Sequence, residues 1–107
     1  MLIMFRARVK KPAGMSRKEF YAIWREEARA SVAAIEQGAF QGLWKVAGCH
    51  EVVGVFNVPD GDAIDGAIES LPVWAMGHSD WVEEIEFLPI RPYEHWAADL
   101  ERMAEED

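Results

Sequence analysis

The chain has 107 residues and a formal net charge of −8, and half of its residues are hydrophobic. This length suits one domain with a real core, so we take residues 1–107 as a single domain with a tail from about residue 92. The acidic balance argues against nucleic acid or an anionic membrane as a partner. No apolar run could cross a membrane and the start lacks the order of a signal peptide, so we expect a cytoplasmic protein. One cysteine excludes an internal disulfide and a thiolate metal site.

The N-terminal third predicts a strand and a long helix. Residues 2–10, LIMFRARVK, alternate between an apolar face and a face that turns basic, which is typical of a strand. A helix is predicted from about residue 16 to residue 37. Ser16 and Glu19 form a capping box at its start, and Gly38 is a natural stop at its end.

The middle of the chain predicts two further strands and a second helix. The stretch LWKVAGCHEVVGVFNV holds strands at about 42–47 and 50–58 on either side of Gly48. After a Pro-Asp-Gly break, a helix is expected at about 62–71. Residues 81–90, WVEEIEFLPI, alternate again and predict a fourth strand. In the tail, apolar residues recur at helical spacing and predict a short docked helix; they are Tyr93, Trp96, Leu100 and Met103.

The order β-α-β-β-α-β predicts an α+β, ferredoxin-like fold, with a four-stranded antiparallel sheet and two helices on one face. The other sheet face would then be bare. Because an apolar sheet face is usually covered by a second copy, we expect a sheet-to-sheet homodimer or a larger homo-oligomer.

Glu27 is the first candidate for chemistry. At 100° per residue it falls in the middle of the apolar stripe of the first helix, whereas Glu26 lies off that stripe. A carboxylate in apolar surroundings has a raised pKa and can act as a general base. The alternative is a structural salt bridge to Arg6, Arg8 or Lys45.

His50 is the second candidate. Alternation along its strand places it on one face with Val52 and Phe56, and Val53 and Val55 suit the helix side. His50 would then lie on the bare side of the sheet, where Gly54 leaves room for a ligand. A lone strand histidine is also commonly structural.

Two arginines and several aromatic residues complete the candidate set. Arg6 and Arg8 share one strand face in an acidic protein and could bind a substrate carboxylate, or could pair with Glu84 and Glu86. Trp24, Phe56 and Trp74 are expected to exclude water from the site. The histidines are too scattered for a metal site, and phosphate-binding or nucleophile-elbow motifs are absent from the sequence.

The segment GLWKVAGCHEVVGVFNVPDGDAIDGAIESLP resembles the central block of muconolactone delta-isomerases. In that family, Leu-Trp-Arg/Lys-Ile/Val-(Ala/Val)-Gly leads into a strand ending Phe-Asp/Asn-Val, and then into a short helix and a Leu-Pro. The resemblance runs from the first strand to Leu71-Pro72, about two thirds of the chain. Beyond Pro72 the sequence departs from the family pattern and adds the tail.

The resemblance implies a ferredoxin-like fold, dimerisation through the sheets and a double-bond shift in an unsaturated lactone without metal or cofactor. The family's base, a carboxylate of the first helix, falls on Glu27. Where the family has tyrosine and asparagine contacts to substrate, this chain has His50 and Val52. The resemblance therefore implies related proton-transfer chemistry on a different small substrate.

The hypothesis is that Glu27 removes a proton next to a carbonyl while His50 donates to the oxyanion or carries the second proton. Arg6 or Arg8 would bind a substrate carboxylate. Two alternatives stay open: a cyclase or lyase on the same scaffold, and a non-catalytic small-ligand-binding oligomer.

Overall fold

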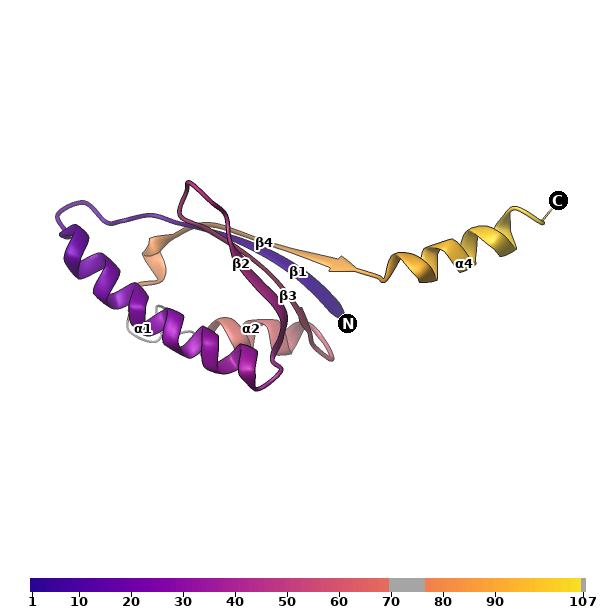
Figure 1. The fold of residues 1–107 in the computed structure, drawn as a ribbon, viewed down its shortest axis with the longest axis horizontal. Coiled ribbons are helices and arrows are strands. Elements are labelled where there is room, and N and C mark those ends of the chain that lie inside the picture. Colours follow the sequence, from indigo (N-terminus) through magenta and orange to yellow (C-terminus); the bar gives the residue numbers. More distant parts are fainter. Residues whose placement is uncertain (70–76, 107) are drawn as a thin grey trace.

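The structure is a computed structural model that describes residues 1–69 and 77–106. Its elements follow the order β-α-β-β-α-β with a final helix, which confirms the predicted order (Figure 1). A short 3-10 helix, η1, comes directly before the fourth strand. The elements are β1 (Leu2–Val9), α1 (Arg17–Glu36), β2 (Phe40–Lys45), β3 (Glu51–Asn57), α2 (Gly61–Glu69), η1 (Ser79–Trp81), β4 (Val82–Ile90) and α4 (Tyr93–Met103).

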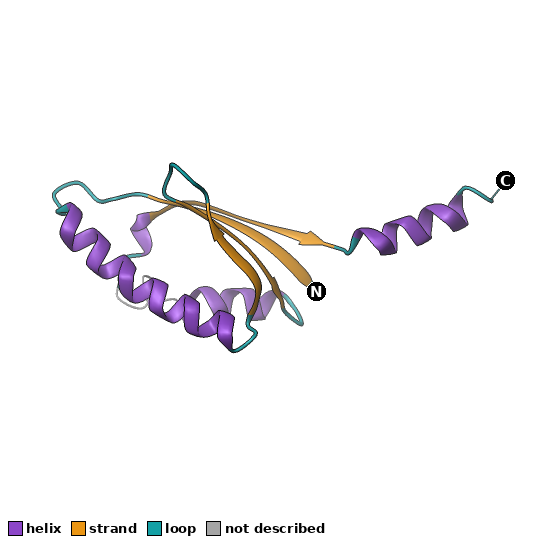
Figure 2. Ribbon diagram, in the orientation of Figure 1, coloured by secondary structure: helices purple, strands orange, loops and turns teal. Residues whose placement is uncertain are grey.

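The four strands form one antiparallel sheet in the order β2-β3-β1-β4, so β2 and β4 are its edges. Both α1 and α2 lie on the same side of this sheet (Figures 1 and 2). The α+β, ferredoxin-like class is therefore confirmed, together with the extra C-terminal helix. The sheet-to-sheet dimer stays a prediction.

Local sequence signals explain where α1 begins and ends. The hydroxyl of Ser16 accepts a hydrogen bond from the backbone N–H of Glu19 at 3.1 Å, as an N-cap does. Gly38 follows the helix with φ of +81°, a conformation that favours glycine. Gly48 turns the chain in the same way before β3. This strand starts one residue later than predicted, so His50 lies in the turn.

The sheet face that meets α1 is the opposite of the predicted one. Val53 and Val55 were expected to face the helices, but Val52 lines a cavity with α1 side chains. Phe56 lies on that same face and packs against Phe5 with ring centroids 5.7 Å apart. Because β3 is apolar on both faces, alternation alone could not choose between them. Aromatic partners from neighbouring strands decide the orientation.

The buried core is small and lies close to the first half of α1. Phe20 and Trp81 are each 1% exposed, and their ring centroids are 4.7 Å apart. Ile3 and Phe56 are the other buried hydrophobic residues of the described chain. In the described ranges, no helix combines the length and apolar character needed to span a membrane. This core anchors α1 next to the turn that holds His50.

The C-terminal helix α4 continues beyond β4, away from the sheet and its helices (Figure 1). The molecule measures 63 × 27 × 22 Å with a radius of gyration of 17.3 Å. A compact domain of this length would have a radius of about 13 Å. The helical tail is thus confirmed. Its expected docking on the body of its own chain is wrong, and Tyr93 is 74% exposed.

Candidate functional site

Glu27 lines a cavity of about 410 Å³ between α1 and the sheet. Its neighbours in the cavity wall are mostly apolar, and they include Phe5, Val52 and Ile85 from three strands. Glu26, one residue earlier, lies on the exposed side of α1 and pairs with Arg29 at 2.8 Å. The helical spacing therefore separates the two carboxylates as predicted, and Glu27 is the one directed towards the sheet.

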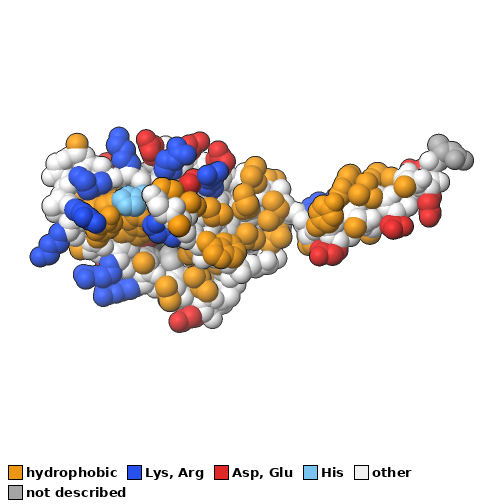
Figure 3. All heavy atoms as spheres, turned by 45° about the horizontal axis from the view of Figure 1, so that its top comes forward, with side chains coloured by type: hydrophobic (Ala, Val, Ile, Leu, Met, Phe, Trp, Pro, Cys, Tyr) orange, Lys and Arg blue, Asp and Glu red, His pale blue; other side chains and the backbone are white. Residues whose placement is uncertain are grey.

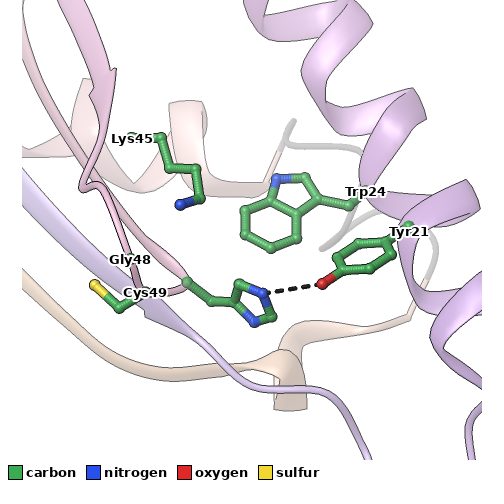
Figure 4. A pocket seen from close by; sticks show the side chains of 6 residues that line it. Tyr21, Trp24, Lys45, Gly48 and Cys49 are labelled. Carbon is green, nitrogen blue, oxygen red and sulfur yellow. Dashed lines mark hydrogen bonds between the residues drawn. The ribbon is translucent and has the colours of Figure 1, made fainter.

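His50 lies in the turn before β3 and faces α1, not the bare sheet face. Its Nε2 is 3.2 Å from the hydroxyl oxygen of Tyr21, the bond drawn as a dashed line in Figure 4. Its ring also meets Trp24 edge-on, with centroids 5.3 Å apart. These contacts fix the imidazole against α1 and leave it at the wall of an open pocket.

That pocket has a volume of about 620 Å³. Figure 4 shows Tyr21 and Trp24 reaching it from α1 and Lys45 reaching it from β2. Trp24 and Lys45 also line the cavity that contains Glu27. The two hollows are therefore neighbours with shared walls, and they bring Glu27 and His50 to the same side of the sheet.

Arg6 and Arg8 lie on the other face of the sheet. Arg6 binds Glu51 through two hydrogen bonds, one of them from Nη2 to Oε2 at 3.2 Å. Arg8 pairs with Glu84 at 3.3 Å. The hydrogen bonds from Arg6 lower the pKa of Glu51, although burial acts the other way, and the same bonds raise the pKa of Arg6.

The structure therefore does not bring Arg6 and Arg8 to the cavity of Glu27. Pairing with a carboxylate on the neighbouring edge strand is confirmed for Arg8, whereas Arg6 pairs with Glu51 of the central strand β3. The alternation of β1 places both arginines opposite its apolar face. That apolar face, with Phe5 and Ala7, is the one that lines the cavity under α1.

The other predicted site residues divide among three places. Trp24 and Val52 line the cavity of Glu27, as the substrate-site prediction requires. Phe56 is only 8% exposed and lies deeper, in an aromatic cluster of the sheet. Trp74 lies outside the described residues. The space expected at Gly54 is filled, since a Cβ there would lie 2.4 Å from the ring of Phe5.

Two residues of the site were missed by the sequence prediction of binding and catalytic groups. Tyr21 precedes Trp24 by three positions, a spacing that places both on one side of a helix. Lys45 lies two residues after Leu43 on β2, so the two side chains share one face of the sheet. These spacings could have placed Tyr21 and Lys45 beside Trp24 if the sheet orientation had been known. Across residues 1–69 and 77–106, His, Cys, Asp and Glu side chains do not cluster as a metal site would require.

This fold and site define a small α+β protein with a helix-borne carboxylate over an apolar cavity. The family model described as muconolactone delta-isomerase matches residues 1–95. The chain therefore belongs to the muconolactone delta-isomerase family. Most of α4 lies beyond the matched range. A comparison with curated proteins gives no match.

Two solved structures show the same fold. A muconolactone isomerase aligns with a TM-score of 0.69 and 23% identity, over 86% of this chain and 90% of that one. A 5-chloro-2-hydroxyhydroquinone dehydrochlorinase from Burkholderia phenoliruptrix AC1100, in complex with 2,5-dihydroxybenzoquinone, aligns with a TM-score of 0.62 and 13% identity, over 89% and 98%. These proteins share the fold and include enzymes that act on small molecules.

Proposed function

We propose that this protein is a cofactor-independent isomerase that shifts a carbon–carbon double bond by proton transfer. Its substrate would be an unsaturated lactone or a related small carbonyl or carboxylate metabolite. The observation that carries the proposal is Glu27, a helix carboxylate in the wall of an apolar cavity of about 410 Å³. Membership of the muconolactone delta-isomerase family supports this reaction class.

In the first step, Glu27 takes a proton from a carbon next to the substrate carbonyl. The electron pair of that C–H bond moves into the carbonyl system and gives a dienolate. The proton then returns from the protein to another carbon, so the double bond moves and the atoms balance. Apolar walls weaken the hydration of the carboxylate and favour its action as a base.

His50 would stabilise the dienolate oxygen or deliver the second proton. Its hydrogen bond to Tyr21 and its edge-on contact with Trp24 hold the ring in place before substrate binds. Preorganised hydrogen-bond donors are usually the largest contribution to such catalysis. Tyr21 therefore acts as a positioning residue for His50.

Lys45 takes the role that the sequence had assigned to Arg6 and Arg8. It lines both hollows, and its ammonium group can bind a substrate carboxylate while Glu27 faces the reacting carbon. A substrate that bridges the two hollows would place its charged end near Lys45 and its ring against Trp24 and Val52.

The proposal includes a cytoplasmic homodimer, or a larger oligomer, formed through the sheet face opposite the helices. That face carries Trp44, which is 59% exposed, and Leu88. It also carries two ion pairs, Arg6 with Glu51 and Arg8 with Glu84, each of which joins a positive side chain on β1 to a negative one on a neighbouring strand. Large exposed apolar side chains among paired charges are typical of a surface that a second copy covers.

Two alternatives use the same cavity. A cyclase or lyase would begin with the same proton removal, after which a ring closes or a leaving group departs. A non-catalytic oligomer would bind the small molecule without turning it over. The products of one experiment can distinguish all three.

The experiment offers unsaturated γ-lactones and the corresponding open-chain acids to the wild-type protein, Glu27→Gln and the matched control Glu26→Gln. An isomerase gives a product of unchanged mass in which only the double bond has moved, whereas a cyclase turns an open-chain acid into a ring of the same mass; NMR of the product separates the two. Glu27→Gln lowers the rate of the double-bond shift by about 10²–10⁴-fold, the usual contribution of a general base. Glu26→Gln should keep the wild-type rate. Near-normal turnover in Glu27→Gln would refute the assignment. Release of the substituent from a γ-lactone that carries a leaving group, offered alongside the others, would indicate a lyase. Saturable binding without product would indicate a binding protein.

A further inference from the structure

The side chain of Trp81 holds a hydrogen-bond donor that its surroundings leave unused. Trp81 is 1% exposed, and its Nε1–H is the one buried side-chain polar group without a hydrogen-bond partner in the described part of the chain. An indole N–H can only donate, so it requires an acceptor. Because buried polar groups are almost always hydrogen-bonded, an exception in a native fold calls for an explanation. The missing acceptor points to a group that comes from outside the chain.

Trp81 borders the cavity of Glu27. It is the last residue of η1, directly before β4, and it lines this cavity. Two backbone hydrogen bonds fix its position: its N–H donates to the carbonyl oxygen of His78 at 3.0 Å, and its carbonyl oxygen accepts from the N–H of Lys10 at 2.8 Å. Phe20 and His78 contact the indole ring, with ring centroids 4.7 and 4.9 Å away. The donor is therefore held in place before a substrate enters.

A buried water molecule would be a poor acceptor for this N–H. An internal water needs roughly two to four hydrogen bonds of its own. His78 touches the ring without a hydrogen bond to Nε1. The side chains that pack around Phe20 and Trp81 are hydrophobic: Val9, Met15, Ile23 and Trp24. They can shift to admit an oxygen atom from the cavity, but they would leave a water there without its other partners. The acceptor that fits is an oxygen of a ligand whose remaining atoms are apolar.

We propose that Trp81 is a further catalytic residue, whose Nε1–H donates a hydrogen bond to the carbonyl oxygen of the substrate and to the dienolate oxygen formed from it. This inference rests on the proposed function. Glu27 and Trp81 line the same cavity of about 410 Å³, a volume typical of a small-molecule site, so one substrate meets both.

The indole keeps its proton throughout the reaction. Glu27 takes the proton from carbon, and the electron pair of that C–H bond moves to the oxygen that Trp81 holds. A preorganised donor is most effective in apolar surroundings, where water does not share the developing charge. Because the indole is neutral, it stabilises the oxyanion without forming an ion pair with Glu27. His50 is then left to return the proton.

Charge at this end of the molecule favours an anionic ligand. Lysine and arginine side chains gather on the half of the body that lies away from α4 (Figure 3). Residues 10–25 form the turn after β1 and the first half of α1, and beside the single acidic residue Glu19 they hold five basic residues: Lys10, Lys11, Arg17, Lys18 and Arg25. The backbone bond between Lys10 and Trp81 places this segment next to the Trp81 end of the cavity. In a chain of net charge −8, the segment attracts anions to that end.

Binding of a phenolate tests the donor without reference to turnover. The probe is para-nitrophenolate, a planar oxyanion that resembles a dienolate, and the protein is Glu27→Gln, whose neutral side chain stands for the base after it has taken the proton. We expect the phenolate to bind and to move the Trp81 indole proton downfield in NMR, because a new hydrogen bond forms there.

Replacement of the Trp81 indole by benzothiophene, through an unnatural amino acid, keeps the ring size and removes the N–H. In the Glu27→Gln background it should weaken phenolate binding about 10–100-fold, the usual effect of one hydrogen bond to a charged group. Thermal unfolding should show no loss of stability, since the N–H has no partner to lose. The NMR signal that the replacement removes identifies Trp81. Trp96→Phe, on α4 and outside the cavity, is the matched control and should leave phenolate binding unchanged.

Three outcomes would overturn the proposal. Equal phenolate affinity with and without the N–H, or an indole signal that does not move, would mean that the oxygen lies elsewhere in the cavity. A lack of phenolate binding to Glu27→Gln would mean that the cavity does not accept an oxyanion. A lower Tm after removal of the N–H would mean that the donor has a structural partner. These results do not depend on the double-bond shift, so an isomerase without the Trp81 contact would still show turnover that requires Glu27.

Discussion

Gly54→Ala tests the packing that fills the space under α1. The added Cβ would lie 2.4 Å from Cε1 of Phe5 and 2.9 Å from Cδ1 of Leu43, well inside contact distance. The ring of Phe5 cannot move away freely, because it packs against Phe40 and Phe56 with centroids 6.1 and 5.7 Å apart. Overpacking of this kind costs about 1–3 kcal/mol, and the lower chain entropy of unfolded alanine offsets about 0.4–1 kcal/mol.

We therefore expect a net loss of roughly 1–2 kcal/mol, equivalent to a fall in Tm of roughly 4–16 °C for a domain of this size. Thermal unfolding followed by circular dichroism measures it. Gly66→Ala in α2 is the matched control, since nothing lies within 4 Å of the added Cβ. That control should gain about 0.5–1 kcal/mol from helix propensity. A Gly54→Ala protein as stable as wild type would show that the site beside Phe5 is open, and the description of the cavity floor would be wrong.

Three further predictions address the core, the ion pair and the site. Phe20→Ala should destabilise the protein by about 3–5 kcal/mol in urea unfolding, because Phe20 is 1% exposed and packs on Trp81; a loss below about 1 kcal/mol would contradict this core. The lowered pKa of Glu51 means that its pair with Arg6 stabilises the fold above about pH 4.3 and is lost as the pH falls through the folded-state pKa. Wild type should therefore lose more Tm than Glu51→Gln between about pH 5 and pH 3; parallel curves would refute the linkage. Tyr21→Phe should lower turnover about 2–10-fold by removing one hydrogen bond to His50; an unchanged rate and pH profile would exclude a positioning role.

Local patterns were enough to predict the architecture. Three signals each depend on only a few neighbouring residues: the cap at Ser16, the glycine stop at Gly38 and the alternation of β1. The position of Glu27 on the inner side of α1 also follows from helical periodicity alone. These features need no knowledge of what packs against them, so the sequence and the structure agree on them.

Features that depend on packing between elements could not be predicted in the same way. The strand β3 is apolar on both faces, so the sequence placed Val52 and Val53 on the wrong sides. That error also placed His50 away from α1, on the sheet face that carries Arg6. The sequence showed the helical stripe of α4, but the direction of α4 depends on its connection to β4 and on the ion pair of Arg91 with Asp99.

The most direct test of the central claim is hydrogen exchange between solvent and substrate, followed by NMR in deuterated water. The wild-type protein and Glu26→Gln should transfer deuterium to the substrate carbon next to the carbonyl and to the carbon that gains the returning proton. Glu27→Gln should lose this transfer while circular dichroism shows the same fold. Exchange at the wild-type rate in Glu27→Gln would contradict the account, because some other group would then be removing the proton.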